Sequence, residues 1–160
     1  AFYLEQSGQM ALDERVHHAY LGNDFGTITR LATDLDTSEV SEAWTAYRIG
    51  EAFNAIGDYA SMLKFYGQAY RLMPLNLRFA DKYGIALFKS RKFEEAKVVF
   101  MDLIEQNPKV AKHWYNMGYY WMTIPDLEKA RIYFEKSLEL DPDYQAAIEA
   151  LNQLNAQSLR

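Results

Sequence analysis

Two adjacent histidines are the side chains of this chain best suited to hold a metal ion. Each lies four positions after an acidic residue, His17 after Asp13 and His18 after Glu14. Residues four apart on a helix share a face and can ligate a metal, but they more often form surface charge pairs. Adjacent helical residues point about 100° apart, so the two histidines cannot converge on one ion. We therefore predict that the chain has no metal site.

Paired carboxylates, the groups that serve general acid and base catalysis, occur as Glu94-Glu95 and as Asp141 with Asp143. Both pairs stand at predicted helix starts, where negative charge stabilises the exposed backbone amides. The sequence has no glycine loop for phosphate, no nucleophile elbow and no zinc-protease motif. Nothing in it brings an acid, a base and an orienting group together. We predict that the chain is not an enzyme and has no cofactor.

A third set of residues combines cations with aromatic rings at helical spacing. Guanidinium and ammonium groups pair with carboxylates, while the rings supply rigid contact area. The set therefore predicts a surface that binds an extended, acidic or C-terminal peptide segment. Its members are Trp44, Tyr47, Arg48, Arg78, Lys82, Lys112, Tyr115, Asn116 and Tyr119. The alternative is that the four cations form a solvated face and pair with Glu51 and Asp81, since surface charges usually contribute little to stability.

The elements that must position these side chains follow a period of 34 residues. Prolines recur at Pro74, Pro108 and Pro142, and glycines at Gly50, Gly84 and Gly118. A third series, Phe25, Tyr59, Phe93 and Leu127, adds one more period toward the N-terminus. A fixed period of this size is the signature of stacked helical hairpins, which usually bind partners. We predict four repeats, at about 9–42, 43–76, 77–110 and 111–144, in one domain over 1–160.

The fourth repeat shows how each hairpin folds. Trp114, Met117, Gly118 and Trp121 lie at i, i+3, i+4 and i+7, the spacing of one helix face. The second helix continues the apolar surface with Leu127, Ala130, Ile132, Tyr133, Phe134 and Leu138. Glycine costs about 1 kcal/mol of helix propensity against alanine, so its recurrence predicts a close approach between helices. Asp24, Asp58 and Asp126 are predicted to cap the second helices, and the prolines to end them.

This fourth repeat, with Trp114, Met117, Gly118, Trp121, Ala130, Phe134 and Pro142, closely resembles the tetratricopeptide repeat (TPR) pattern. The resemblance implies an all-α fold, a right-handed superhelical solenoid of four TPR helical hairpins plus a C-terminal capping helix at 145–158. The first repeat departs most from the pattern, and we expect its helices near 8–21 and 25–36. In the capping helix Ala147, Leu151 and Leu154 are expected to face inward.

The resemblance also implies where a ligand binds. In TPR arrays the stripe of first-helix residues opposite the packing face looks into a concave groove. Here that stripe carries the predicted site, with Tyr47 and Tyr115 at neighbouring positions. Chaperone-binding members hold a terminal carboxylate with a clamp of lysine, asparagine, asparagine, lysine and arginine. The matching positions in this chain are Asp13, His17, Arg48, Arg78 and Lys82. Only Arg78 and Lys82 keep the character of the clamp, and Asp13 reverses the charge, so a different basic groove is predicted.

Composition and charge limit the partners. Hydrophobic residues make up 49% of the chain and charged residues 24%, which is typical of a folded, soluble protein, and no apolar run is long enough for a membrane span. Residues 1–42 carry two basic and eight acidic side chains, whereas 43–160 carry 15 and 14. This balance argues against nucleic acid as a partner. We predict a protein or peptide partner, and no direct membrane insertion.

The alternative function is architectural. The chain would then be a spacing or self-association segment, a homo-oligomer or a domain flanking another in a larger protein, without a free ligand. The apolar Phe2-Tyr3-Leu4 segment is a predicted docking surface for that role. Because the first residue is Ala1, we also expect the chain to be a fragment or a processed product. The absence of cysteine leaves its compartment open.

Overall fold

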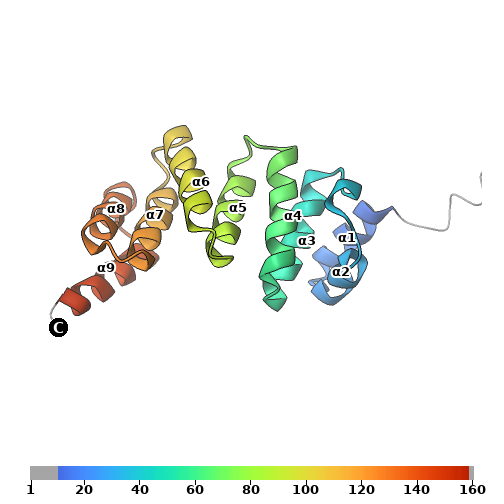
Figure 1. Ribbon diagram of the computed structural model, residues 1–160, viewed down its shortest axis with the longest axis horizontal. Helices are drawn as coiled ribbons and strands as arrows, with labels where there is room; N and C mark the ends of the chain where they lie inside the picture. Colours follow the sequence, from blue (N-terminus) through green and yellow to red (C-terminus); the bar gives the residue numbers. More distant parts are fainter. Residues whose placement is uncertain (1–10, 159–160) are drawn as a thin grey trace, which may run out of the picture. The chain divides into compact units, whose positions relative to one another are not determined.

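The computed structural model describes residues 11–158, and within this range every regular element is a helix (Figure 1). The elements are α1 (Leu12–Leu21), α2 (Phe25–Ala32), the 3-10 helix η1 (Thr37–Glu39), α3 (Ala43–Ile56), α4 (Tyr59–Leu72), α5 (Leu77–Lys89), α6 (Phe93–Gln106), α7 (Ala111–Thr123), α8 (Leu127–Leu140) and α9 (Gln145–Ser158). The predicted all-α class is confirmed. No described helix is both long and apolar enough to cross a membrane.

The chain divides into two compact units, which are described separately. The N-terminal unit runs to Ala86 and the C-terminal unit begins at Leu87, so the division falls within α5. It does not coincide with any predicted repeat boundary. The number of repeats and the single domain remain predictions.

In the N-terminal unit, α1 packs on α2 and α3, and α3 packs along α4. The core forms where the apolar faces of these helices meet, and Val16, Ile28 and Ile49 are fully buried in it. The rings of Phe53 and Phe65 stack between α3 and α4 with their centroids 5.7 Å apart. Aromatic burial of this kind supplies much of the hydrophobic stabilisation of a small helical unit.

In the C-terminal unit, α7 packs along α8, and α9 packs on both. Phe134 of α8 and Leu154 of α9 are fully buried in one apolar cluster. The inward face predicted for the last helix is confirmed, since Ala147 and Leu154 are buried while Asn152 and Gln153 are exposed. The last described helix therefore closes the apolar face that α7 and α8 leave open.

The close helix approach predicted from the glycines is confirmed at two of them. A Cβ atom on Gly50 would lie 2.5 Å from Cδ1 of Tyr66, and one on Gly118 would lie 2.5 Å from Cδ1 of Phe134. Carbon atoms in contact normally stand about 3.5–4.0 Å apart. Glycine therefore lets the ring of the second helix lie directly against the backbone of the first, which brings α3 to α4 and α7 to α8.

The predicted caps are also confirmed. The carboxylates of Asp24, Asp58 and Asp126 accept backbone hydrogen bonds from the third residue of α2, α4 and α8. These bonds satisfy amides that have no partner inside the helix. The aspartate that precedes α2, α4 and α8 is thus held in place by a local hydrogen bond.

Two sequence expectations differ from the structure. The second helix of the first repeat was expected near 25–36, but α2 ends at Ala32. Asp36 starts η1 instead, because its carboxylate accepts from Ser38 N and Glu39 bonds back to the Asp36 amide. Ile132 was expected in the packing stripe but is 62% exposed. It lies two residues from both Ala130 and Phe134, about 200° around the helix, and so on the outer face.

The part of the first expected helix at 8–10 lies outside the described residues, as does the Phe2-Tyr3-Leu4 segment.

Candidate peptide-binding surfaces

Five of the nine predicted site residues lie in the N-terminal unit, on α3 and α5: Trp44, Tyr47, Arg48, Arg78 and Lys82. Trp44 and Arg48 are four residues apart on α3, as Arg78 and Lys82 are on α5, so each pair shares a helix face. We call these five residues the α3/α5 surface.

Aromatic contacts hold α3 against the first turn of α5. The ring centroid of Phe79 is 4.9 Å from that of Trp44 and 5.4 Å from that of Tyr47. Trp44 remains 40% exposed, whereas Tyr47 is only 7% exposed. Trp44 therefore offers ring surface to a ligand, and Tyr47 supports it from beneath.

The two arginines of the surface lie against aromatic rings. The guanidinium carbon of Arg78 is 5.7 Å from the Trp44 ring centroid, and that of Arg48 is 5.9 Å from the Tyr20 ring centroid. Such cation–π contacts orient a guanidinium group without neutralising it. Within residues 11–158, no carboxylate forms an ion pair with either arginine. Both remain able to pair with an acidic ligand.

The Tyr47 hydroxyl stays protonated near neutral pH. Burial raises the pKa of Tyr47 to about 12, and the nearby Glu51 and Tyr20 add to the rise, while Arg78 opposes it. This phenol therefore adds no negative charge beside the arginines.

Lys82 differs from the arginines because it already has a carboxylate partner. Its Nζ lies 2.7 Å from Oε1 of Glu51, and the Tyr66 hydroxyl donates to the same oxygen. Burial, the hydrogen bond to Glu51 and the charge of Glu51 raise the pKa of Tyr66. The charge of Lys82 is thus largely offset, and the pairing with Glu51 that the solvated-face alternative expects is confirmed for this one cation.

The other four predicted residues, Lys112, Tyr115, Asn116 and Tyr119, lie on α7 in the C-terminal unit. Lys112 is exposed and Tyr119 is 43% exposed, whereas Asn116 is only 8% exposed. Tyr115 is half-buried, with its ring centroid 6.3 Å from that of Tyr119. These four residues therefore form a group of their own on α7.

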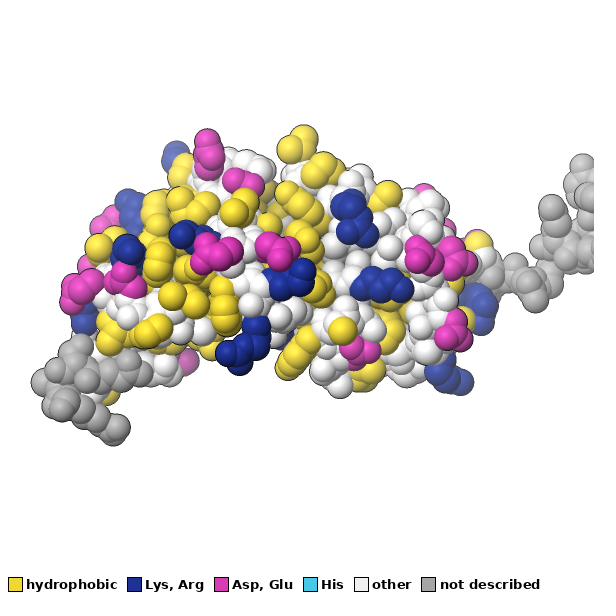
Figure 2. Space-filling model, viewed as in Figure 1, with side chains coloured by type: hydrophobic (Ala, Val, Ile, Leu, Met, Phe, Trp, Pro, Cys, Tyr) yellow, Lys and Arg dark blue, Asp and Glu magenta, His cyan; other side chains and the backbone are white. Residues whose placement is uncertain are grey.

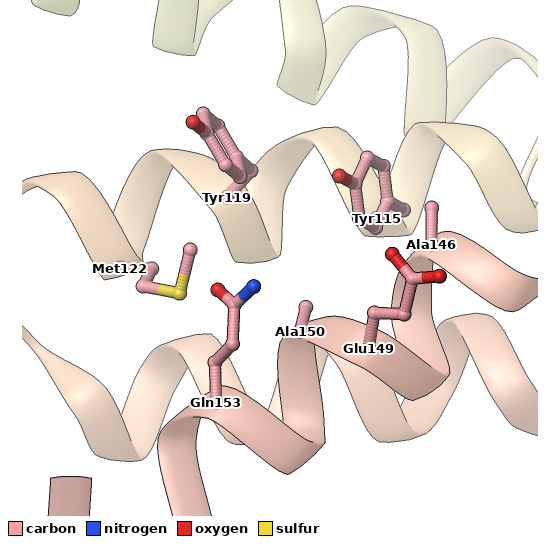
Figure 3. A pocket seen from close by; sticks show the side chains of 7 residues that line it. All are labelled: Tyr115, Tyr119, Met122, Ala146, Glu149, Ala150 and Gln153. Carbon is pink, nitrogen blue, oxygen red and sulfur yellow. The ribbon is translucent and has the colours of Figure 1, made fainter. Parts of the chain in front are cut away.

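A pocket of about 90 Å³ opens between α7 and α9 (Figure 3). Its lining consists of Tyr115, Tyr119 and Met122 from α7 and of Ala146, Glu149, Ala150 and Gln153 from α9. Pockets for small-molecule cofactors are typically about 300–1,000 Å³, so this one has room for a side chain only. We call it the α7/α9 pocket. Its two tyrosines were predicted from the sequence, whereas the rest of the lining was not, because α9 was expected only to cap the array.

On the face drawn in Figure 2, the basic side chains of each unit are interspersed with acidic ones. Among the described residues, no three His, Cys, Asp or Glu side chains lie close enough to hold a metal ion together. The rings of His17 and His18 have centroids 6.1 Å apart.

Comparison with known proteins supports the resemblance. The tetratricopeptide repeat family model matches residues 111–144. Anaphase-promoting complex subunit cut9 of Schizosaccharomyces pombe is 28% identical over 71 residues, which cover 44% of this chain and 11% of that protein. The matched segment therefore spans only about a tenth of the length of that relative.

Solved structures of TPR proteins share the fold at low sequence identity. MamA superposes with a TM-score of 0.75 at 17% identity, covering 94% of this chain and 86% of MamA. YrrB, a TPR protein with an unusual peptide-binding site, gives 0.70 at 20% identity, covering 86% and 68%. The first TPR of Spaghetti (RPAP3), bound to the HSP90 peptide SRMEEVD, gives 0.65 at 21% identity, covering 74% and 94%.

Proposed function

We propose that this chain, which contains a tetratricopeptide repeat at residues 111–144 and has the fold of the TPR proteins, is a protein interaction module without catalytic activity. Its ligand is an extended peptide segment with acidic side chains or an acidic C-terminus. The α3/α5 surface is the principal contact in this proposal. The exposed groups on α7 are a further contact region of the C-terminal unit.

The observation that carries the proposal is the pair of arginines at the α3/α5 surface. Arg48 and Arg78 lie against aromatic rings, and no described carboxylate pairs with either. An arginine presents a planar fork of donors that matches a carboxylate, so two such groups favour an acidic ligand over a basic one. Trp44, at 40% exposure, supplies apolar contact area beside Arg78.

The ion pair between Lys82 and Glu51 limits which cations of the surface can attract the ligand. Because Glu51 already lies 2.7 Å from Lys82, a ligand carboxylate would have to compete with it for this ammonium group. Arg48 and Arg78 therefore supply most of the electrostatic attraction, and Lys82 mainly holds α5 to α3. This division of roles separates the site from a clamp in which all cations contact the ligand.

One of the similar structures holds an acidic peptide. The peptide bound by the RPAP3 domain, SRMEEVD, carries two glutamates and one aspartate. The carboxylate clamp of chaperone-binding TPR proteins has a lysine and an asparagine at two positions where α1 of this chain has Asp13 and His17. We therefore propose an acidic ligand whose exact sequence differs from the chaperone peptide.

A peptide array tests the proposal. Seven-residue peptides of graded Asp and Glu content are probed with the wild-type chain and with Arg48→Gln/Arg78→Gln. The matched control is Arg15→Gln/Arg71→Gln, which removes the same charge from two exposed positions of the same unit outside the α3/α5 surface. Wild type and control should prefer acidic peptides, and the site variant should lose that preference. Equal binding by all three proteins would refute the site.

Exposed apolar side chains on α6 and α8 favour the architectural alternative as a second candidate. Val98 and Ile132 are 60% and 62% exposed on α6 and α8, and Met101 is 43% exposed. The Tyr133 hydroxyl lies 3.8 Å from the sulfur of Met101, which joins the two helices here. Exposed apolar side chains that gather in one area mark contact surfaces.

Sedimentation equilibrium separates this candidate from the first. Self-association that disappears in Val98→Gln/Ile132→Gln would establish an assembly role. A monomeric wild-type chain would exclude self-association through this surface.

A further inference from the structure

The α7/α9 pocket has a chemistry opposite to that of the α3/α5 surface. Its lining contains two phenol rings, a thioether, a carboxylate and an amide, and it contains no lysine or arginine. Figure 3 shows Tyr115 and Tyr119 on one side and Glu149 and Gln153 across from them on α9. The faces of aromatic rings and a carboxylate both attract a cation.

The walls of the pocket are held in place by their own packing. Tyr115 is fixed by the edge of Tyr144, with centroids 5.4 Å apart, and by the buried Phe134, at 5.7 Å. Phe88 supports Tyr119 at 5.6 Å. On the other side, Leu154 anchors α9 in the core. Binding therefore requires little ordering of the walls, which favours even a small ligand group.

Glu149 supplies the charge. It is exposed, and within residues 11–158 no lysine or arginine forms an ion pair with it. Its field reaches into the pocket, because Glu149 contributes, after burial and Tyr119, to raising the pKa of Tyr115. A carboxylate entering the pocket would be repelled, and a cation would be attracted.

We propose that the α7/α9 pocket binds one lysine or arginine side chain of a protein partner. Its volume of about 90 Å³ accommodates the end of such a side chain. The alkyl stem would pack on Met122 and the alanines of α9, and the charged end would lie between the tyrosine rings and Glu149. This site does not depend on the acidic-peptide proposal, since no residue of the α3/α5 surface takes part.

The methyl group of Met122 reports on the pocket directly. In protein labelled with ¹³C-methyl methionine, its signal is assigned by comparison with Met122→Leu. The probes are the N-acetyl methylamides of lysine, arginine and norleucine, where norleucine keeps the alkyl chain without the charge. Lysine and arginine should shift the Met122 signal in a saturable way. The signal of Met62, which is 1% exposed in the N-terminal unit, should stay fixed.

Two variants test the assigned contacts. Glu149→Gln should lower the affinity for the lysine probe about threefold, the size expected for one exposed ion pair. Tyr119→Leu should weaken it further, while Glu135→Gln, an exposed acidic residue of α8 outside the pocket, should change nothing. In each variant the dispersed signal of Met117, which is fully buried on α7, verifies that the C-terminal unit is folded.

Three results would overturn the proposal. One is norleucine binding as well as lysine, which would make the pocket merely apolar. Another is unchanged lysine affinity in Glu149→Gln. The third is a Met122 signal that no cation shifts at any soluble concentration. None of these results bears on Arg48 and Arg78, so the acidic-peptide proposal stands or falls separately.

Discussion

Replacing Gly50 with alanine tests how closely α3 and α4 must pack. The added Cβ would lie 2.5, 2.7 and 3.0 Å from three ring carbons of Tyr66. Normal contact needs about 3.5 Å or more, so the ring must move by about 1 Å. It has little room to do so, because Tyr66 is 2% exposed and its hydroxyl donates to Glu51.

The magnitude follows from two opposing effects. Overpacking of a buried contact costs up to about 3 kcal/mol, and alanine returns about 1 kcal/mol of helix propensity. We expect Gly50→Ala to lower the free energy of unfolding by about 2 kcal/mol. The control is Gly26→Ala in α2, where the added Cβ would meet only one atom, at 3.7 Å. This control should be neutral or slightly stabilising.

Urea unfolding followed by far-ultraviolet circular dichroism measures both variants against the wild type. If Gly50→Ala unfolds at the same or a higher urea concentration than the wild type, the Tyr66 ring moves aside freely. The close-approach explanation for the repeated glycines would then be refuted.

Three further changes test other parts of the structure by the same unfolding measurement. Lys82→Met should cost about 1 kcal/mol, since it leaves the carboxylate of Glu51 without its cation, and adding Glu51→Gln should recover most of the loss. Asp58→Ala should cost about 1 kcal/mol at neutral pH. The hydrogen bonds from Ser61 lower the folded-state pKa of Asp58. The stabilisation by Asp58 is therefore complete above the ordinary pKa of 3.8 and is lost as the pH falls through the folded-state pKa. A cost of Asp58→Ala that persists at about pH 2 would contradict the role assigned to the charge of Asp58. Ser137→Ala should cost about 1 kcal/mol, because the fully buried hydroxyl donates to a backbone carbonyl of α7 at 2.9 Å; no change would show that the bond contributes nothing.

The helices and their caps were predictable because they depend on residues close in sequence, and the glycine contacts because the glycines recur with the repeat. Asp58 caps α4 through a residue three positions later, and Gly50 recurs at a fixed phase of the repeat. Ile132 was wrongly predicted to face inward, although helix geometry alone places it on a different side of α8 from Ala130 and Phe134.

The burial and the charge pairing of the site residues were harder to predict because they depend on contacts between helices. The 100° step places Arg48 and Lys82 on their helices, but it does not show that Lys82 meets Glu51 across 31 positions. The burial of Tyr47 likewise depends on Phe79 of the next helix. The α7/α9 pocket was missed because α9 was treated only as a cap, although Glu149 and Gln153 are four residues apart on one face of it.

The most direct test of the central claim is the calorimetric affinity of one acidic peptide, chosen from the array, for the wild type and for Arg48→Gln/Arg78→Gln. The account predicts that the variant binds about tenfold more weakly, a loss of about 1.4 kcal/mol. It also predicts that the wild-type affinity falls as salt is added, and that Arg15→Gln/Arg71→Gln binds as the wild type does. Equal affinity of the wild type and the site variant would contradict the claim that these two arginines bind the ligand.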